Sequence, residues 1–224
     1  MDDRLWGIIK ESFPKLLKTG IEVTIPLTVL SFALALVIAV IVALIQYAKV
    51  SGLQQICRFY IWIIRGTPLL VQLYLVFYGL PSVGIVFDAF PAAVLVFGFN
   101  EGAYMAEAIR GTLEGVNVGQ LEAGYCVGMS YGQTMWHVVL PQALRMAFPA
   151  LSNSLISMLK GTSMAATITV VEMLRQAQNF NGRRYETLLL YVEVALIYLA
   201  FCTILTWFQR RGEKRLASYG GVRT

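Results

Sequence analysis

Charge is what this 224-residue sequence has least of. Only 14% of its residues are charged and 57% are hydrophobic, with a mean hydropathy of +0.65, whereas soluble domains carry about 25% charged residues. A chain this apolar is expected to be an integral membrane protein. Its net charge of +5 suits anionic lipid head groups, and nucleic acid is not an expected partner.

Sequence signatures of catalysis and metal binding are also scarce. The sequence has no GxxxxGK[ST] phosphate loop, so the chain is not expected to hydrolyse nucleotide itself. His137 is the single histidine, which excludes a paired-histidine metal site, and neither HExxH nor a hydrolase nucleophile elbow is expected. Cys57, Cys126 and Cys202 are scattered, odd in number and without a CxxC, so they are interpreted as small apolar packing residues. We expect no catalytic residues and no metal site.

What the sequence does contain is long apolar runs. A helix needs about 20 apolar residues to cross a hydrocarbon core. The sequence predicts an all-α protein with five such spans, at about 23–48, 59–80, 91–110, 148–170 and 187–208. Residues 1–18 are mixed in charge and predict an amphipathic helix lying in the membrane interface, which Pro14 is expected to break or re-aim.

Orientation follows from the last span. Arg210, Arg211, Lys214 and Arg215 follow it at once, which is typical of a cytoplasmic end. The tail 210–224 is therefore predicted to be cytoplasmic. Five spans then place the N-terminus outside and the 111–144 connection in the cytoplasm, with a narrow excess of positive charge on the inner side.

Polar residues inside the predicted spans are costly, about 2.5–3.5 kcal/mol for a charge near the bilayer centre, and they usually face a polar interior. Asn100, Tyr104 and Glu107 share one helical face with Glu101 beside them, and Asn153, Ser157 and Lys160 share another. Two such faces can enclose a polar substrate pathway, with Glu193 as a third wall. The alternative is that these groups only join helix to helix. A separate interruption, at Arg65, Gly66, Thr67 and Pro68, predicts a bend or an outer gate.

The 111–144 connection is too long and too patterned for a plain turn. A helix is predicted to open at Glu122, Ala123 and Gly124, to break at Gly128–Ser130, and to be followed by a second short helix over 131–139. Leu140 and Pro141 then re-enter the membrane, since proline is favoured in the first turn of a helix. From pattern alone, a surface loop with a glycine turn is an equal alternative.

These residues carry a resemblance. The run GQLEAGYCVGMSYGQTMWHVVLPQALR (119–145) resembles the EAA loop of type I ATP-binding-cassette importer permeases, in the form seen in polar amino-acid permeases. The runs RFYIWIIRGTPLLVQLYLVFYGLP (58–81) and PALSNSLISMLKGTSMAATI (149–168) are similar to the same family. The similarity covers about 19–209. The RGTPL…YGLP form of the second run, together with Gly84-Ile85 after it, resembles the cystine-type branch.

The resemblance implies a type-1 transmembrane domain in the bacterial cytoplasmic membrane that forms a homo- or heterodimer. It implies two cytoplasmic ATPase subunits, which bind the ATP and magnesium, and an external amino-acid-binding protein. Glu122 would pair with the ATPase and Gly128 would set the turn, while Gly124 replaces the usual alanine. Because glycine costs about 1 kcal/mol of helix propensity, we expect a slightly looser first turn there. In some members polar groups of the later spans hold the amino acid, and the matching residues here are Asn100, Glu101, Tyr104, Asn153, Ser154 and Lys160.

The prediction is therefore a non-enzymatic permease subunit of an ATP-driven importer for a polar amino acid, with cystine as one candidate. The alternative is a stand-alone polar-lined channel or secondary transporter. An internal inverted repeat would favour a secondary transporter, and none is recognised.

Overall fold

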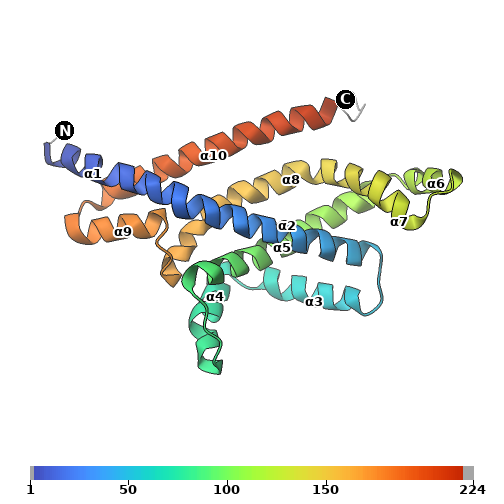
Figure 1. Cartoon of the computed structure of the whole chain (residues 1–224), viewed down its shortest axis with the longest axis horizontal. Helices are drawn as coiled ribbons and strands as arrows, with labels where there is room; N and C mark the ends of the chain where they lie inside the picture. Colours follow the sequence, from blue (N-terminus) through green and yellow to red (C-terminus); the bar gives the residue numbers. More distant parts are fainter. Residues whose placement is uncertain (1–2, 219–224) are drawn as a thin grey trace.

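The computed structural model describes residues 3–218, and every regular element in that part of the chain is helical (Figure 1). Short π and 3-10 segments connect or extend some of the helices. The α-helices are α1 Asp3–Thr19, α2 Ile25–Tyr47, α3 Leu53–Gly66, α4 Leu69–Tyr74, α5 Ala89–Gly115, α6 Gly119–Cys126, α7 Tyr131–Thr134, α8 Leu140–Gly161, α9 Met173–Arg184 and α10 Thr187–Ser218. Residues 1–2 of the predicted interfacial helix and 219–224 of the predicted tail lie outside the described residues, and 210–218 belong to α10.

The first two helices form one continuous rod. α1, the π segment Gly20–Thr24 and α2 run unbroken from Asp3 to Tyr47, so the prediction that Pro14 breaks or re-aims the helix is wrong. Pro14 is exposed, so the carbonyl whose hydrogen bond it removes faces outward, where water can satisfy it. Ser12 and Leu16, on either side of Pro14, are fully buried and hold the helix against its neighbours.

Three π segments share one sequence feature. Each ends two residues before a proline, and the pairs are Gly20–Thr24 with Pro26, Leu75–Gly79 with Pro81, and Met135–Val139 with Pro141. A proline ring clashes with the carbonyl four residues earlier, and that carbonyl belongs in each case to the middle residue of the π segment. The wider π turn makes room for the ring. Leu140-Pro141 therefore does not start a new helix as predicted, because α8 continues a helix that begins at Tyr131.

The helices differ in how clearly they qualify as membrane spans. Within the described residues, two helices are each long and apolar enough to span a membrane by themselves. They run from Asp3 to Tyr47 and from Thr187 to Leu216. Two bent pairs, Leu53–Gly66 with Leu69–Val83 and Tyr131–Ile168 with Met173–Arg184, raise the number to four. α5 has 27 residues and is about 40 Å long at 1.5 Å per residue, which is enough to cross a bilayer.

The main core lies between α2, α5 and α8, and small residues let α2 and α5 approach closely. Ala35, Ala39 and Ala43 of α2 are fully buried. On α5, a Cβ atom at Gly98 would lie 2.5 Å from Leu34 Cδ2, and one at Gly102 would lie 3.0 Å from Ile38 Cγ2. Gly98 and Gly102 thus form a GxxxG contact of the kind that packs membrane helices.

The molecule has two distinct ends (Figure 1). The α6–α7 hairpin lies at one end, with the turn between α2 and α3 on the same side. α9 and the start of α1 lie at the other end. α4 projects sideways from the bundle at the level where α3 stops. This arrangement separates the predicted coupling segment from the N-terminal end by nearly the length of the molecule.

Candidate coupling surface and polar pathway

The predicted helix–turn–helix is present as α6 and α7. Gly128 has a φ of +79°, a conformation that glycine adopts without strain. The amide of Gly128 bonds to the carbonyl of Tyr125 and that of Met129 to the carbonyl of Gly124, both at 3.0 Å, which closes α6 with a Schellman-type cap. Ser130 then begins α7 with a capping box. The turn is therefore fixed by local hydrogen bonds of the backbone and of the Ser130 and Gln133 side chains.

Gly124 has a role that sequence reasoning missed. It is buried, and a Cβ atom there would lie 2.5 Å from both Cγ2 and Oγ1 of Thr134. The expected looser turn is not seen, because α6 is regular from Gly119 to Cys126. Glycine at this position instead lets α6 pack directly against α7.

The letters GMSYG (128–132) match the GxSxG pattern of a nucleophile elbow, which sequence reasoning did not recognise. That motif needs the serine on a sharp turn between a strand and a helix. Here a helix precedes the turn, and Ser130 Oγ accepts a hydrogen bond from the amide of Gln133 at 3.3 Å. Ser130 is a helix cap. Among residues 3–218, no group of three or more His, Cys, Asp or Glu side chains could hold a metal.

The surface of the hairpin is apolar and exposed around one acidic residue. Glu122 and Ala123 lie in the middle of α6 and are both exposed, whereas Leu140 is 6% exposed and anchors the segment to the core. Large apolar side chains gather on the same hairpin. This docking patch consists of Val118, Tyr125, Val127, Tyr131 and Trp136, with exposures of 44 to 76%. Exposed apolar patches of this kind mark protein–protein contacts. Cys126 is also exposed, so the interpretation of all three cysteines as packing residues is wrong there, while Cys57 is buried.

The predicted pathway residues divide into two groups. Tyr104 of α5 is 43% exposed, and Asn153, Ser157 and Lys160 of α8 are also exposed. Glu101 of α5 lies close to the side chain of Ser154 on α8. These residues form one polar face across α5 and α8, open to the outside of the single chain.

Asn100 belongs instead to the bend between α3 and α4. It is 7% exposed, and its Nδ2 donates to Gln72 Oε1 at 3.0 Å. Gln72 Nε2 in turn donates to the carbonyl of Ile64 at 2.8 Å and to Thr67 Oγ1 at 2.8 Å. The two helices meet at 104°, and Thr67 is extended, the conformation that a following proline favours. Gln72 supplies the donors that the broken helix lacks, and a polar residue inside an apolar run was the signal for it.

Glu107 is likewise not part of the polar face predicted for α5. Arg110 Nε lies 3.1 Å from Glu107 Oε1, Arg65 Nη1 lies 3.7 Å from Oε2, and Gln46 Nε2 donates to Oε1 at 3.3 Å. Arg65 also lies over the ring of Tyr104, 5.1 Å from its centroid. The predicted gate residue Arg65 therefore joins α3 to α5 next to the polar face, and a cavity of about 380 Å³ lies beside this cluster.

Glu193 does not form a third wall of the pathway. It is 5% exposed, and Ser12 of α1 donates to its Oε2 at 2.7 Å. Its Oε1 is buried without a hydrogen-bond partner among the described residues. The rotation of α10 thus turns Glu193 toward α1. Another buried acid, Glu172, caps α9 by accepting from the amides of Leu174 and Arg175, and sequence reasoning did not identify it.

The comparisons with known proteins agree along most of the chain. The profile of the family described as "Binding-protein-dependent transport system inner membrane component" matches residues 35–218. The L-cystine transport system permease protein TcyB of Bacillus subtilis is 44% identical over 96% of this chain and 92% of its own. The probable amino-acid ABC transporter permease protein PatM of Vibrio harveyi is 41% identical over 92% and 93%. A solved amino acid ABC transporter crystallised with histidines superposes with a TM-score of 0.85 at 31% identity, covering 96% of this chain and all of the other.

Proposed function

Because this chain belongs to the family of binding-protein-dependent transport system inner membrane components, we propose that it carries a polar amino acid across the cytoplasmic membrane, driven by ATP that a separate subunit hydrolyses. The observation that carries the proposal is the α6–α7 hairpin. It is a rigid element at one end of the bundle that presents Glu122 and the docking patch to a partner.

The partner at the hairpin is proposed to be an ABC ATPase subunit, which would hold the ATP and magnesium. The docking patch supplies apolar area, and exposed Glu122 supplies one charge for a basic residue of the partner. The cap at Gly128 and the close contact at Gly124 keep the hairpin rigid. A rigid hairpin continuous with α8 can transmit movement of the partner to the membrane helices.

The substrate is proposed to pass along the polar face of α5 and α8, which is open in the single chain. A second permease subunit across from this face would complete a polar channel between two copies or two related chains. An amino acid carries both charges, and the face offers Glu101 and Lys160 as partners of opposite sign. An external binding protein would deliver it at the α9 end.

The topology proposed for this function has five spans, with α5 as the third and α3–α4 as one broken span. The basic residues of α10 would lie in the cytoplasm, together with the α6–α7 hairpin. The N-terminus would then lie outside, where α1 extends beyond the first span along α9.

The substrate is proposed to be cystine or a similar polar amino acid, by similarity to TcyB. The test is uptake by vesicles that contain the chain, its ATPase subunit and its cognate binding protein, using a panel of radiolabelled amino acids. Uptake that needs ATP and all three components is expected. Full uptake by the purified chain alone would contradict the proposal and would favour a channel or secondary transporter.

A further inference from the structure

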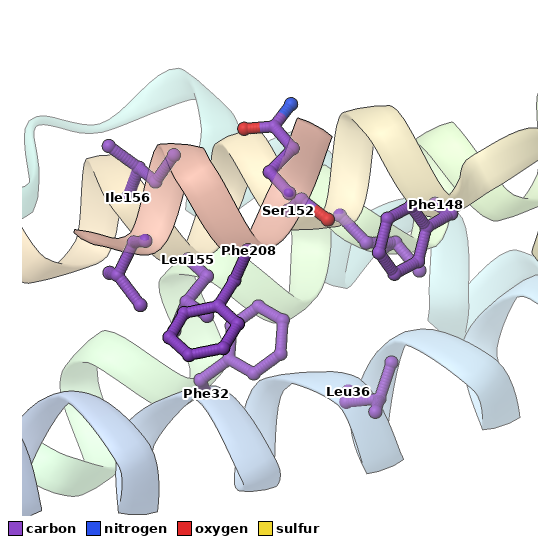
Figure 2. Close-up of a pocket in the computed structure, with 10 residues that line it drawn as sticks. Phe32, Leu36, Phe148, Ser152, Leu155, Ile156 and Phe208 are labelled. Carbon is purple, nitrogen blue, oxygen red and sulfur yellow. The ribbon is translucent and has the colours of Figure 1, made fainter. Parts of the chain in front are cut away.

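An apolar cavity lies between the C-terminal half of α10 and helices α2 and α8 (Figure 2). The first half of α10 is held tightly, with Leu190 fully buried against the α1–α9 end. Further along, Phe32 and Leu36 of α2, Leu155 of α8 and Phe208 of α10 line a cavity of about 320 Å³. Cavities of about 300 Å³ and above hold small ligands.

The cavity lies on the side of α8 that faces α2 and α10, next to the polar face. Phe148, Ser152 and Leu155 line it, whereas Asn153 and Lys160 belong to the exposed polar face. With 3.6 residues per turn, the centres of the two sets lie about 120° apart around the helix. The polar face and the cavity are therefore neighbouring but distinct surfaces of α8.

A second, more open cavity of about 450 Å³, lined by α10 alone, adjoins the first toward the end of α10. It shares Phe208 and adds Trp207, Arg211 and Arg215. The guanidinium of Arg211 lies over the Trp207 ring, 5.4 Å from its centroid. A tryptophan next to arginines at the end of an apolar helix is typical of the level of the lipid head groups.

The charge around this second cavity is strongly positive. Arg210 and Lys214 are exposed on the same two turns of α10 as Arg211. The acid within these turns, Glu213, accepts a hydrogen bond from Gln209 at 3.0 Å. The apolar cavity and the basic, aromatic cavity next to it are together complementary to a lipid with an anionic head group.

We propose that the two cavities together bind one anionic phospholipid of the cytoplasmic leaflet. One acyl chain lies in the apolar cavity between α2, α8 and α10, and the phosphate group lies against Arg211 beside Trp207. The site goes beyond the transport function, because it is separate from both the coupling hairpin and the polar face. The lipid would fill the space that α10 leaves open.

The test uses the full chain with Trp207 as its single tryptophan, obtained by W6F, W62F and W136F. The chain is placed in phosphatidylcholine vesicles that contain a small fraction of a lipid with brominated acyl chains, which quench tryptophan fluorescence on contact. Brominated phosphatidylglycerol should quench Trp207 at least about threefold more than brominated phosphatidylcholine at the same mole fraction. Equal quenching by the two lipids would overturn the proposal.

Two variants separate the contact with the lipid head group from the contact with its acyl chain. Arg211→Gln should abolish the preference for phosphatidylglycerol, and Ser152→Phe, which fills the apolar cavity, should reduce the excess quenching. Arg183→Gln removes the same charge from the opposite end of the molecule and should change nothing. The proposal fails if R183Q acts like R211Q, or if S152F leaves the excess quenching intact.

Two other occupants are distinguished in the same system. If soluble glycerol phosphate removes the excess quenching, the basic pocket binds a free phosphate and the lipid proposal is wrong. If neither lipid reaches Trp207 in a cross-linked dimer, a second copy of the chain covers the face and the proposal is equally wrong. Native mass spectrometry of the unaltered chain gives an independent measurement: one retained phosphatidylglycerol is expected, and its presence in R211Q would contradict the site.

Discussion

At the scale of single residues, the close contact at Gly124 decides how the coupling hairpin packs. A Cβ atom there would lie 2.5 Å from two atoms of Thr134. Gly124→Ala should therefore separate α6 from α7 at a cost of about 1–3 kcal/mol. Amide hydrogen exchange over 119–134 should become faster by the corresponding factor.

Gly132 offers a matched control on the same hairpin, because a Cβ atom there meets nothing within 4 Å. Gly132→Ala should leave exchange unchanged or slow it, since alanine favours helix by about 1 kcal/mol over glycine. Equal exchange in the two variants would show that the Thr134 contact does not hold the hairpin.

Lys160 tests the polar face. Lys160→Ala removes an exposed cation from α8 and should lower the rate of amino-acid uptake by about tenfold, equivalent to roughly 1.4 kcal/mol. Assembly with the ATPase should be intact by size-exclusion chromatography. Lys10→Ala, which removes an exposed cation from α1, should transport normally. Unchanged uptake kinetics in K160A would exclude a pathway role for this residue.

Glu11 links α1 to the end of α9. Arg184 Nη2 lies 2.6 Å from Glu11 Oε2 and Lys15 Nζ lies 3.3 Å from Oε1. These hydrogen bonds, that of Arg184 foremost, lower the pKa of the Glu11 carboxyl below its usual 4.5. A lowered pKa in the folded state means that ionised Glu11 stabilises the fold above pH 4.5, and that this contribution is lost as pH falls through the folded-state pKa.

The melting temperature should show this dependence. Glu11→Gln should melt below the unaltered chain at pH 7, and the two melting temperatures should converge as pH falls below 4.5. The difference should be small, because the pair is partly exposed and is screened by salt. A difference that stays constant between pH 7 and pH 3 would contradict the ion pair.

At the scale of helices, the GxxxG contact of α5 holds the first span in place. Gly98→Ala places a Cβ atom 2.5 Å from Leu34, which overpacks the interface between α2 and α5 and should cost about 1–3 kcal/mol. Thermal unfolding in detergent measures this loss.

Gly111→Ala on the same helix is the control, since a Cβ atom there meets nothing within 4 Å. It should be neutral or slightly stabilising. Equal losses of melting temperature in G98A and G111A would show that helix propensity, not the contact with α2, sets the result.

Helices and breaks were the features most readily predicted from sequence. Long apolar runs located the helices, Pro68 located the bend, and Gly128 located the turn, because each depends on local backbone chemistry. Pro14 was misjudged for a related reason: whether a proline breaks a helix depends on what packs around it. The π segments before Pro26 and Pro141 show a second way for a helix to pass a proline.

The partners of polar residues could not be predicted in the same way. Glu107 and Glu193 both lie in predicted spans, but one meets Arg65 and Arg110 and the other meets Ser12. Those pairs depend on how each helix is rotated about its axis, which hydropathy does not encode when most faces are apolar. The GxxxG spacing of Gly98 and Gly102 was present in the sequence and would have indicated one of these rotations.

At the scale of the whole molecule, the proposed functions are distributed along one axis. The coupling hairpin lies at one end, the polar face lies along α5 and α8, and α9 lies at the other end (Figure 1). A force on the hairpin reaches the polar face directly, because the helix from Tyr131 to Ile168 is continuous between them. That continuity, made possible by the π turn before Pro141, is the structural basis of the coupling we propose.

The most direct test of this account reverses the charge at Glu122. In vesicles that contain the chain, its ATPase subunit and its binding protein, Glu122→Lys should lose most of the amino-acid-stimulated ATP hydrolysis. Placing a like charge against a basic partner costs several kcal/mol, or more than about thirtyfold in rate. Glu22→Lys, the same exchange at an exposed residue beyond α1, should retain stimulation. Full stimulation in E122K would contradict the coupling account.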